Sequence, residues 1–541
     1  MLDLPVSQLN LPANVKKYLT GSLMNLEVQV PAGEFNVARV ILDDRDSQTY
    51  KTSAFSIVSS NYEFKTLSLE ELRADSLIVA EELHRAKLVK GDRVVLKMHN
   101  CLQFPALFLG CLRLGLIPVP VSTLLTAAET DFIINDSGAV GVISQPSLKN
   151  SLNANDDSQL RIKWFFSEDQ SIQEFFSTQV SFSSDFVFTE AEDPAYLVYT
   201  SGTTGKPKGV IHPHRSRLGR LPAMLHWFDM SKQNRLLHTG KLNWTYVLGT
   251  GFMDPLFQGK QVTLFDGEAK PQDWLNILII SKSDSFITVP AIYRQILQRT
   301  TDFTEKLPYL KHCLSAGEKL SAQVLSRFKE RFDLTIREGL GMTEVSYYLG
   351  QPAFLPSVEG AAGKVQPGHK VALINESFDE VPANQEGMLA VHRSDPGLFS
   401  GYWRQGQSLD RPLQEGYFLT GDYAYRDDDG NIFFLGRKDE IINSMGYRVS
   451  PFEVERVLKD LPGIQDAAVF SQEVEEQKKL ICAALVIEKG QMLKEDDVKK
   501  HAVANLAKYK SPHLYVFLDQ LPRTANGKVQ RNQLRSACGL A

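Results

Sequence analysis

Short apolar runs that alternate with helix-period segments are the feature that most constrains the fold of this chain. Runs rich in β-branched and aromatic residues occur at positions 139–144, 195–200, 261–265, 285–289 and 334–338. Amphipathic segments with the spacing of a helix lie among them, at 291–298 and 321–332. Such alternation is typical of α/β proteins whose sheets are rich in parallel strands. We therefore predict an α/β fold.

The length of the chain predicts more than one domain, because a single core rarely grows beyond about 250–300 residues and this chain has 541. Toward the C-terminus, Lys and Glu become more frequent. Strand-like runs at 466–470 and 480–487 accompany a helix-like run at 495–506 there. We expect a large N-terminal domain over residues 1–436, with parallel-rich sheets and helices. A small, mobile α+β lid domain is expected over residues 437–541.

Charge and cysteine content argue against several classes of protein. The net charge is −5, whereas general nucleic-acid binders usually carry a basic balance. The five cysteines include no CxxC pair, which predicts reduced thiols in a cytoplasmic protein without a zinc site. The N-terminus lacks the long apolar run of a signal peptide. The most apolar window, 104–121, carries Arg113 and two prolines, so we expect a buried helix leading into a strand and no membrane span.

The stretch YTSGTTGKPKG, at residues 199–209, follows a predicted strand but can form neither a helix nor a packed strand. Its glycines and proline interrupt regular structure. Backbone N–H groups of such a loop converge on an anion, and hydroxyl groups and lysines add donors. The loop is not a Walker A motif, because Thr200 stands in place of its first glycine and Pro207 follows Lys206. A phosphate-binding loop and a mobile surface linker remain the two interpretations.

Three further segments carry polar patterns that each permit an ordinary explanation. Thr420–Asp422 can be a turn, Thr343 can cap a helix, and the Asn-Gly pair in segment 522–531 can form a hairpin tip. Lys528 by itself is most often a solvated lysine. The joint occurrence of these segments with the loop 199–209, in this order and at these spacings, instead indicates one functional site.

With these segments the chain resembles the adenylate-forming superfamily of acyl-CoA synthetases, nonribosomal-peptide adenylation domains and luciferases. The motifs YTSGTTGKPKG, GMTE, TGD, GRKDE and NGK carry the resemblance, which covers nearly the whole chain. It implies a large N-terminal domain, a small mobile C-terminal domain and an active site between them. It also implies a reaction in two steps. ATP converts a carboxylic acid to acyl-AMP with release of pyrophosphate, and a thiol, usually that of coenzyme A, then displaces AMP.

The resemblance also implies roles for individual residues. Catalytic roles fall on Lys528, Thr203 and Glu344, with Thr203 and Glu344 near Mg²⁺ and Lys528 bridging the carboxylate and the α-phosphate. ATP contacts are expected from Thr200, Ser201, Gly202, Thr204, Gly205, Lys206, Lys208, Gly317, Glu338, Gly339, Leu340, Thr343, Asp422 and Arg437. Of these, Asp422 and Arg437 would reach the ribose, Asp422 through charge-assisted hydrogen bonds.

The resemblance places the moving parts after the TGD motif. Asp439, in GRKDE, fits the hinge about which the C-terminal domain turns between the two steps. Gly446 and Arg448, in MGYR, would lie along the path of coenzyme A, where a side chain at the glycine would block the thiol.

Two features resemble the acyl- and benzoate-CoA ligase branch of the superfamily. Residues 93–130 and 238–259 are similar to that branch. Leu340 occupies a position where the family usually has a tyrosine stacked on adenine, and benzoate-CoA ligases likewise carry an aliphatic residue there. Adenine would then pack against Leu340 through apolar contact.

The acyl pocket that the resemblance implies contains Trp244, Tyr246, Gly249, Ala316 and Tyr347. Aromatic walls combined with small residues suit a flat ring or a medium-length chain. Ordinary core packing is the alternative explanation for Trp244 and Tyr246. An α-amino acid is a less suitable substrate, because KLNWTY lacks the Asp with which amino-acid-activating members hold the ammonium group.

We therefore expect an acyl- or aryl-CoA ligase that uses ATP, Mg²⁺ and coenzyme A on a small-molecule carboxylic acid. The alternative is a stand-alone ligase that loads the acyl group onto a separate acyl carrier protein, because it would share every adenylation residue. A catalytically idle homologue is less consistent with the sequence, since such a site has no need of Lys528.

Overall fold

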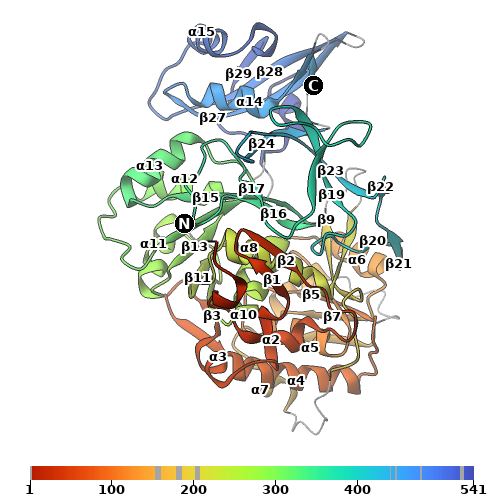
Figure 1. The fold of residues 1–541 in the computed structure, drawn as a ribbon. Coiled ribbons are helices and arrows are strands. Elements are labelled where there is room, and N and C mark those ends of the chain that lie inside the picture. Colours follow the sequence, from red (N-terminus) through yellow and green to blue (C-terminus); the bar gives the residue numbers. More distant parts are fainter. Residues whose placement is uncertain are drawn as a thin grey trace.

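The computed structural model describes residues 3–152, 160–177, 186–200, 207–438, 440, 442–444, 447–475, 478–523 and 529–540. Its architecture confirms the α/β class, with a large N-terminal part and a smaller C-terminal part stacked above it in Figure 1. Within the described ranges no helix has the length and apolar character needed to cross a membrane.

Among the described residues, nine strands form the largest sheet, and six consecutive ones pair in parallel. In spatial order they are β17 (Lys364–Val365), β16 (Ser346–Gly350), β15 (Ile336–Met342), β14 (His312–Ala316), β13 (Ser285–Thr288), β11 (Arg235–His238), β12 (Gln261–Phe265), β3 (Ala54–Val58) and β4 (Phe64–Ser68). Apolar residues of three helices pack together against one face of the sheet: α11 (Pro271–Ile280), α12 (Pro290–Arg299) and α13 (Ala322–Phe332). Short helices and turns cover the other face, namely η3 (His214–Arg220), α8 (Leu221–His226), α9 (Thr245–Leu248), the π-helical turn η4 (Gly249–Met253) and α10 (Asp254–Phe257).

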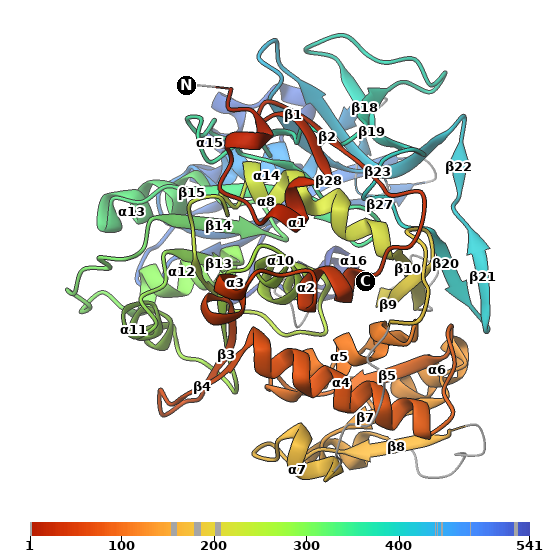
Figure 2. The same ribbon diagram turned by 60° about the horizontal axis from the view of Figure 1, so that its bottom comes forward.

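A second, fully parallel sheet has the order β6-β5-β7-β8 and lies beside helices α4 and α5 in Figure 2. Its strands are β5 (Arg93–Lys97), β6 (Ile117–Pro120), β7 (Gly141–Ser144) and β8 (Ile162–Phe165), and the helices around it are α4 (Leu69–Arg85), α5 (Gln103–Arg113), α6 (Ala127–Ser137) and α7 (Ile172–Phe176). The apolar window 104–121 is therefore a buried helix leading into a strand, as predicted. Arg113 is tolerated there because its guanidinium pairs with the Asp43 carboxylate at 3.2 Å.

The predicted phosphate loop joins two antiparallel strands, β9 (Pro194–Thr200) and β10 (Lys208–Pro213). The same sheet contains β20 (Gly401–Arg404), which lies next to β10, and β21 (Gln407–Asp410), which lies next to β20. A five-stranded antiparallel sheet follows, built from β18 (Val371–Ile374), β19 (Glu386–His392), β22 (Leu413–Gln414), β23 (Tyr417–Arg426) and β24 (Ile432–Arg437).

The C-terminal part begins with the β25–β26 hairpin (Ile442–Ser444 and Tyr447–Val449). Its further elements are α14 (Pro451–Lys459), β27 (Ile464–Glu475), β28 (Lys478–Ile487), α15 (Glu495–Asn505), η5 (Lys508–Lys510), β29 (Leu514–Phe517) and α16 (Arg531–Ala537). Buried apolar residues from position 442 onward form clusters of their own.

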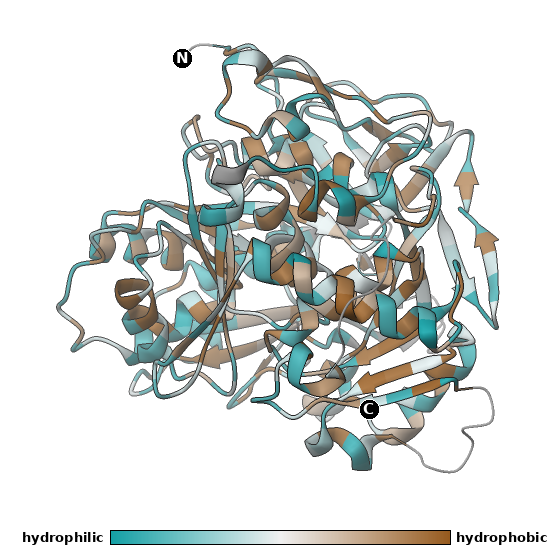
Figure 3. Cartoon of the chain, turned by 90° about the horizontal axis from the view of Figure 1, so that it is seen from below, coloured by the Kyte–Doolittle hydropathy of each residue, from teal (hydrophilic) through white to brown (hydrophobic). Residues whose placement is uncertain are grey.

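The remaining elements lie near the N-terminus, where η1 (Val6–Gln8), α1 (Ala13–Lys16), β1 (Leu19–Ser22), β2 (Asn25–Val28), α2 (Val37–Leu42) and α3 (Ser47–Thr52) precede β3; η2 (Pro146–Ser151) follows β7. Figure 3 shows that the hydrophobic residues concentrate on the central strands and on the inner sides of the helices around them.

Candidate active site

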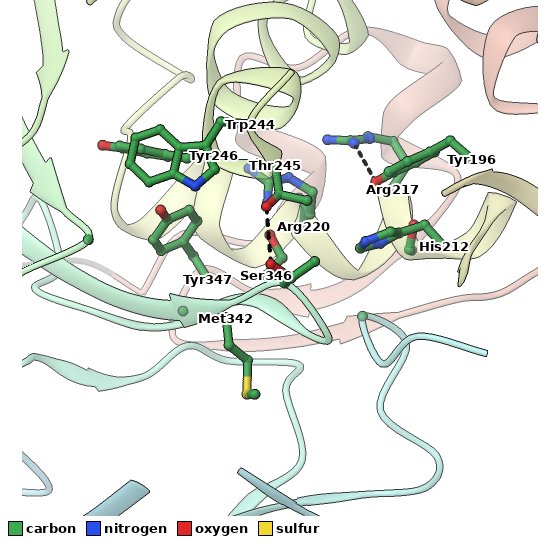
Figure 4. Close-up of a pocket in the computed structure, with 15 residues that line it drawn as sticks. Tyr196, His212, Arg217, Arg220, Trp244, Thr245, Tyr246, Met342, Ser346 and Tyr347 are labelled. Carbon is green, nitrogen blue, oxygen red and sulfur yellow. Dashed lines mark hydrogen bonds between the residues drawn. The ribbon is translucent and has the colours of Figure 1, made fainter. Parts of the chain in front are cut away.

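A cavity of about 100 Å³ lies where η3, α9, β10 and the β15–β16 hairpin meet (Figure 4). Five residues that the sequence predicted for one site line it: Trp244, Tyr246, Gly317, Thr343 and Tyr347. The structure thus brings together segments that are far apart in the chain.

Aromatic rings form one wall of the cavity. The rings of Trp244 and Tyr246 meet edge to face with their centroids 5.3 Å apart, and Tyr347 lies 5.1 Å from Tyr246. Tyr347 in turn packs against the fully buried Trp227, with centroids 4.8 Å apart. The Trp244–Tyr246 contact is edge to face and the other two are tilted, and such aromatic pairs add to the stabilisation from apolar burial alone.

Gly317 and Thr343 lie beside this wall. Gly317 has a φ of +98°, which favours glycine, and a Cβ there would meet the Trp244 ring at an ordinary contact distance of 3.5 Å. The Thr343 and Thr245 hydroxyl groups are 3.3 Å apart. Ala316 and Gly249, expected in the acyl pocket, adjoin the lining rather than form it in the described structure.

Gly249 has a different contact. A Cβ at this position would lie 2.4 Å from Nη2 of Arg220, so the absence of a side chain leaves room for the guanidinium. Sequence reasoning did not single out Arg220, nor Arg217 and Asp254, which surround it. The signal was the density of arginines in HRSRLGR, directly after β10.

A second cluster lies at the Lys208 end of β10. The Glu344 carboxylate accepts a hydrogen bond from the Tyr402 hydroxyl at 2.9 Å, and Lys208 Nζ lies 3.5 Å from the same oxygen. The lysine also lies over the Tyr402 ring, 4.0 Å from its centroid. Burial and the neighbouring carboxylate raise the pKa of Tyr402, so its hydroxyl keeps its proton. Sequence reasoning found Glu344 and Lys208 but missed Tyr402.

The TGD segment lies on β23 opposite the end of β24. Asp422 and Arg437 are direct cross-strand partners, and Nη1 of Arg437 donates to the Asp422 carboxylate at 3.2 Å. Asp422 is buried, and its backbone N–H donates to the Thr420 hydroxyl. Gly421 has a φ of +79° and lies beside the Arg437 guanidinium. The pair that the sequence predicted at the ribose is therefore assembled.

Three predicted ATP-binding residues, Glu338, Gly339 and Leu340, are consecutive on β15. The Glu338 carboxylate accepts a hydrogen bond from the Leu320 N–H at 2.8 Å and is buried, and burial raises its pKa to about 7. A Cβ on Gly339 would lie 2.5 Å from the Trp227 ring. Leu340 packs on the apolar cluster of the five-stranded sheet.

Several predicted residues lie outside the described structure: Ser201, Gly202, Thr203, Thr204, Gly205, Lys206, Asp439, Gly446 and Lys528. Thr200 and Lys208 flank the first six of them and face each other across β9 and β10. Arg448 is on β26, where its backbone pairs with Asn443.

Comparison with known proteins gives matches along most of the chain. The family model described as AMP-binding enzyme matches residues 44–403, and the one described as AMP-binding enzyme C-terminal domain matches residues 453–528. The human mitochondrial acyl-coenzyme A synthetase ACSM3 is 30% identical over 93% of this chain and 89% of its own length. The benzoate–CoA ligase of Thauera aromatica is 30% identical over 82% of this chain and 86% of its own length.

Solved structures show the same fold. ATP-bound MatB from Rhodopseudomonas palustris superposes with a TM-score of 0.83 at 26% identity, covering 93% of this chain and 99% of that one. A benzoate CoA ligase from Burkholderia xenovorans LB400 gives a TM-score of 0.79 at 25% identity and covers 93% and 100%.

Proposed function

Because this chain belongs to the AMP-binding enzymes and is an AMP-forming ligase of the acyl-CoA synthetase type, we propose the following course for its reaction. A small carboxylic acid binds in the cavity and reacts with ATP to give acyl-AMP and pyrophosphate. The thiol of coenzyme A then attacks the acyl carbon, and AMP leaves. The second step is possible because AMP is a better leaving group than the oxygen of a free carboxylate.

The observation that carries this proposal is the composition of the cavity wall. Gly317 and Thr343, from the motif segments, line the same cavity as Trp244, Tyr246 and Tyr347. An acid held against the aromatic rings would therefore present its carboxylate to the segments that we assign to the nucleotide. Such positioning converts an encounter between two anions into a reaction within one complex.

Positive charge is the main requirement of the first step, because a carboxylate must approach the α-phosphate. We assign Lys208 and the loop 200–206 to the β- and γ-phosphates, and Lys528 to the carboxylate and the α-phosphate. Removing one donor of this kind typically lowers the rate by about 10²–10³. We assign Asp422 and Arg437 to the ribose hydroxyl groups and Leu340 to the adenine face.

The donor set around Glu344 fits a Mg²⁺ ion. The described residues contain no cluster of three or more potential metal ligands, and Mg²⁺ is usually held by one or two carboxylates together with substrate phosphates. Glu344 supplies one buried carboxylate beside Lys208, and Thr203 would add a hydroxyl. The ion would neutralise charge on the phosphates.

The second step requires the C-terminal part to move. We propose residues 1–436 and 437–541 as the two domains, with Asp439 as the hinge. Gly446 and Arg448 would then lie along the entry path of coenzyme A. All five cysteines are unpaired, which supports a reducing, cytoplasmic location. The relatives named above are ligases of coenzyme A, so loading of a separate carrier protein is not favoured.

AMP release from ATP, with and without coenzyme A, tests the proposal. The acids are benzoate, aminobenzoates, phenylacetate, short mono- and dicarboxylates and fatty acids. We expect at least one acid to give AMP release that depends on coenzyme A, with the acyl-CoA detected by mass spectrometry. If acyl-AMP accumulates and coenzyme A adds nothing, the assigned acceptor is wrong.

A further inference from the structure

We propose that the acid activated by this protein carries a second carboxylate, and that Arg217 and Arg220 bind it in the cavity. The substrate would thus be a short dicarboxylic acid rather than a simple fatty or aromatic monoacid. This inference rests on the proposed function and names the substrate class of the same site.

The two arginines belong to a buried cluster in the cavity wall. Asp254, which is 0% exposed, accepts hydrogen bonds from Arg220 Nε at 2.9 Å to both of its carboxylate oxygens. It also pairs with Arg217 and with Arg220 Nη2. Arg217 is 2% exposed and Arg220 4%, and both line the cavity.

The charges in this cluster do not balance. Two guanidinium groups face one carboxylate, and arginine stays protonated in proteins. The other titratable neighbours are Tyr196, Tyr347 and His212. Burial and the two arginines lower the pKa of His212 to about 3, so the imidazole is neutral, and burial raises the pKa of Tyr347. One positive charge therefore remains.

An unbalanced buried charge costs free energy unless a partner arrives. A carboxylate on the ligand would supply that partner, and it suits the planar fork of a guanidinium. Unpartnered polar atoms of lining residues support this assignment: within the described structure, Arg217 Nε, Ser216 Oγ, His212 Nε2 and Ser346 Oγ have no hydrogen-bond partner. A purely structural cluster would be expected to satisfy its own donors.

The arrangement of the cavity gives the acid a direction. In Figure 4, Arg217, Tyr196 and His212 lie on the opposite side of the view from Trp244 and Tyr246. The reacting carboxylate would lie toward Gly317 and Thr343, and the second one toward the arginines.

The volume of the cavity limits the length of the acid. At about 100 Å³ it is smaller than the ~150 Å³ of an engineered cavity that accepts benzene. A short diacid therefore fits better than the flat ring or medium-length chain that the sequence suggested.

Isosteric acid pairs test the proposal on the wild-type enzyme. Succinate is compared with succinamate and malonate with malonamate, because the amide keeps the shape and removes the charge. Glutarate, phthalate, butyrate and benzoate extend the series. We expect kcat/KM for AMP release in the presence of coenzyme A to favour the best diacid over its amide by about 100-fold or more, since a site built for a polar group rejects analogues that lack it.

Substitution of Arg217 tests whether this residue causes the preference for the diacid over its amide. Arg217→Met leaves Arg220 paired one to one with Asp254, so kcat/KM for the diacid should fall toward that of the amide, and Arg217→Lys should restore part of it. Arg215→Gln is the control. Arg215 is also buried in η3, but it binds Glu192 and the carbonyls of Pro396 and Leu398 instead of lining the cavity, so its loss should not change the ratio.

The outcomes separate this inference from the proposed function. If monocarboxylates or the amides react as well as the diacids, the second-carboxylate site is overturned and the ligase stands. If no acid of either class supports AMP release that depends on coenzyme A, both are overturned. If Arg217→Met does not fold, the acid pairs on the wild-type enzyme decide alone.

Discussion

Tyr402 has two contacts that a substitution can separate. Its hydroxyl donates to Glu344 while its ring lies under the Lys208 ammonium. Tyr402→Phe keeps the ring and removes the hydrogen bond, and a hydrogen bond to a charged group is worth about 1.5–3 kcal/mol. We expect the Mg²⁺ concentration for half-maximal pyrophosphate release to rise about tenfold, because Glu344 loses the donor that orients it. Tyr425→Phe, whose ring stacks on Phe433, is the matched control. An unchanged Mg²⁺ dependence in Tyr402→Phe would contradict the assignment of Glu344.

The buried Glu338 carboxyl predicts how the stability of the protein depends on pH. Its folded-state pKa is about 7, above the ordinary value of 4.5, because burial disfavours the charged form. The folded state therefore binds this proton more tightly, so the stabilisation is complete below pH 4.5 and is lost as pH rises through 7. The total is about 3 kcal/mol at ~1.4 kcal/mol per pKa unit.

Glu338→Gln cannot ionise and still offers an oxygen to the Leu320 N–H. We expect the free energy of unfolding of the variant, relative to wild type, to improve between pH 5 and pH 8. Urea unfolding at a series of pH values measures the difference. A difference that stays constant with pH would sink the prediction.

At the scale of elements, β15 combines a structural and a functional task. Gly339 lies under the Trp227 ring, and Trp227 supports Tyr347 in the cavity wall. The indole N–H donates to the Arg337 carbonyl at 3.2 Å, which limits how far the ring can move. The strand can therefore approach Trp227 only because position 339 has no side chain.

Gly339→Ala tests this packing. The new Cβ would lie 2.5 Å from the indole, and overpacking of a core typically costs about 1–3 kcal/mol. We expect that loss in urea unfolding, together with weaker acid binding through displacement of Tyr347. Combining it with Trp227→Phe should recover part of the loss in a double-mutant cycle. Gly33→Ala, where a Cβ meets nothing within 4 Å, is the control. Additive effects in the cycle would show that the two residues do not interact.

Secondary structure was predictable where a segment carries its own signal. The run 261–265 coincides with β12, because β-branched and aromatic residues favour a pleated strand. The run 334–338 was displaced, since β15 spans Ile336–Met342. Its glycines at 339 and 341 carry no strand signal, and pairing with β14 and β16 holds them extended.

The candidate site was predictable only where contacts follow known motifs. Asp422 and Arg437 lie 15 positions apart and pair across the β23–β24 hairpin. Asp422 belongs to the TGD motif and Arg437 to the GRKDE motif, so both could be recognised from the sequence. Tyr402 bonds to Glu344 across 58 positions, and Arg217 pairs with Asp254 across 37. No local sequence pattern predicts such pairs, because only tertiary folding brings the two residues together. The density of arginines in HRSRLGR was visible in the sequence, but their position in the cavity wall was not.

For the whole molecule, a chain of charges joins the two parts. Arg523 of the C-terminal part donates to Glu318 at 3.2 Å and to Asp466 at 2.5 Å. Glu318 also pairs with Arg294 on α12, at 3.7 Å, and directly follows Gly317 in the cavity wall. Arg523 precedes Lys528 by five positions. We propose that this contact helps to hold the C-terminal part in the arrangement of the first step, in which we assign Lys528 to the acid.

Glu318→Gln should consequently slow one half-reaction more than the other. The substitution keeps the shape and removes the charge from a pair whose side chains are 24% and 19% exposed, and a loss of about 1–2 kcal/mol corresponds to a factor of about 5–30. We expect acyl-AMP formation, followed by pyrophosphate exchange, to fall by that factor. Thioester formation from supplied acyl-AMP should stay near wild type.

The control is a second ion pair that joins the N-terminal and C-terminal parts but is more exposed to solvent. Arg327 pairs with Glu488 at 4.0 Å; the Arg327 side chain is 54% exposed and the Glu488 side chain 30%. Exposed pairs contribute about 0–1 kcal/mol, so Arg327→Gln should leave both half-reactions nearly unchanged. Equal slowing of both half-reactions by Glu318→Gln would mean that the Arg523 contact is not specific to the adenylation arrangement. Slowing of the first alone would link the charge chain to the domain position in which acyl-AMP is made.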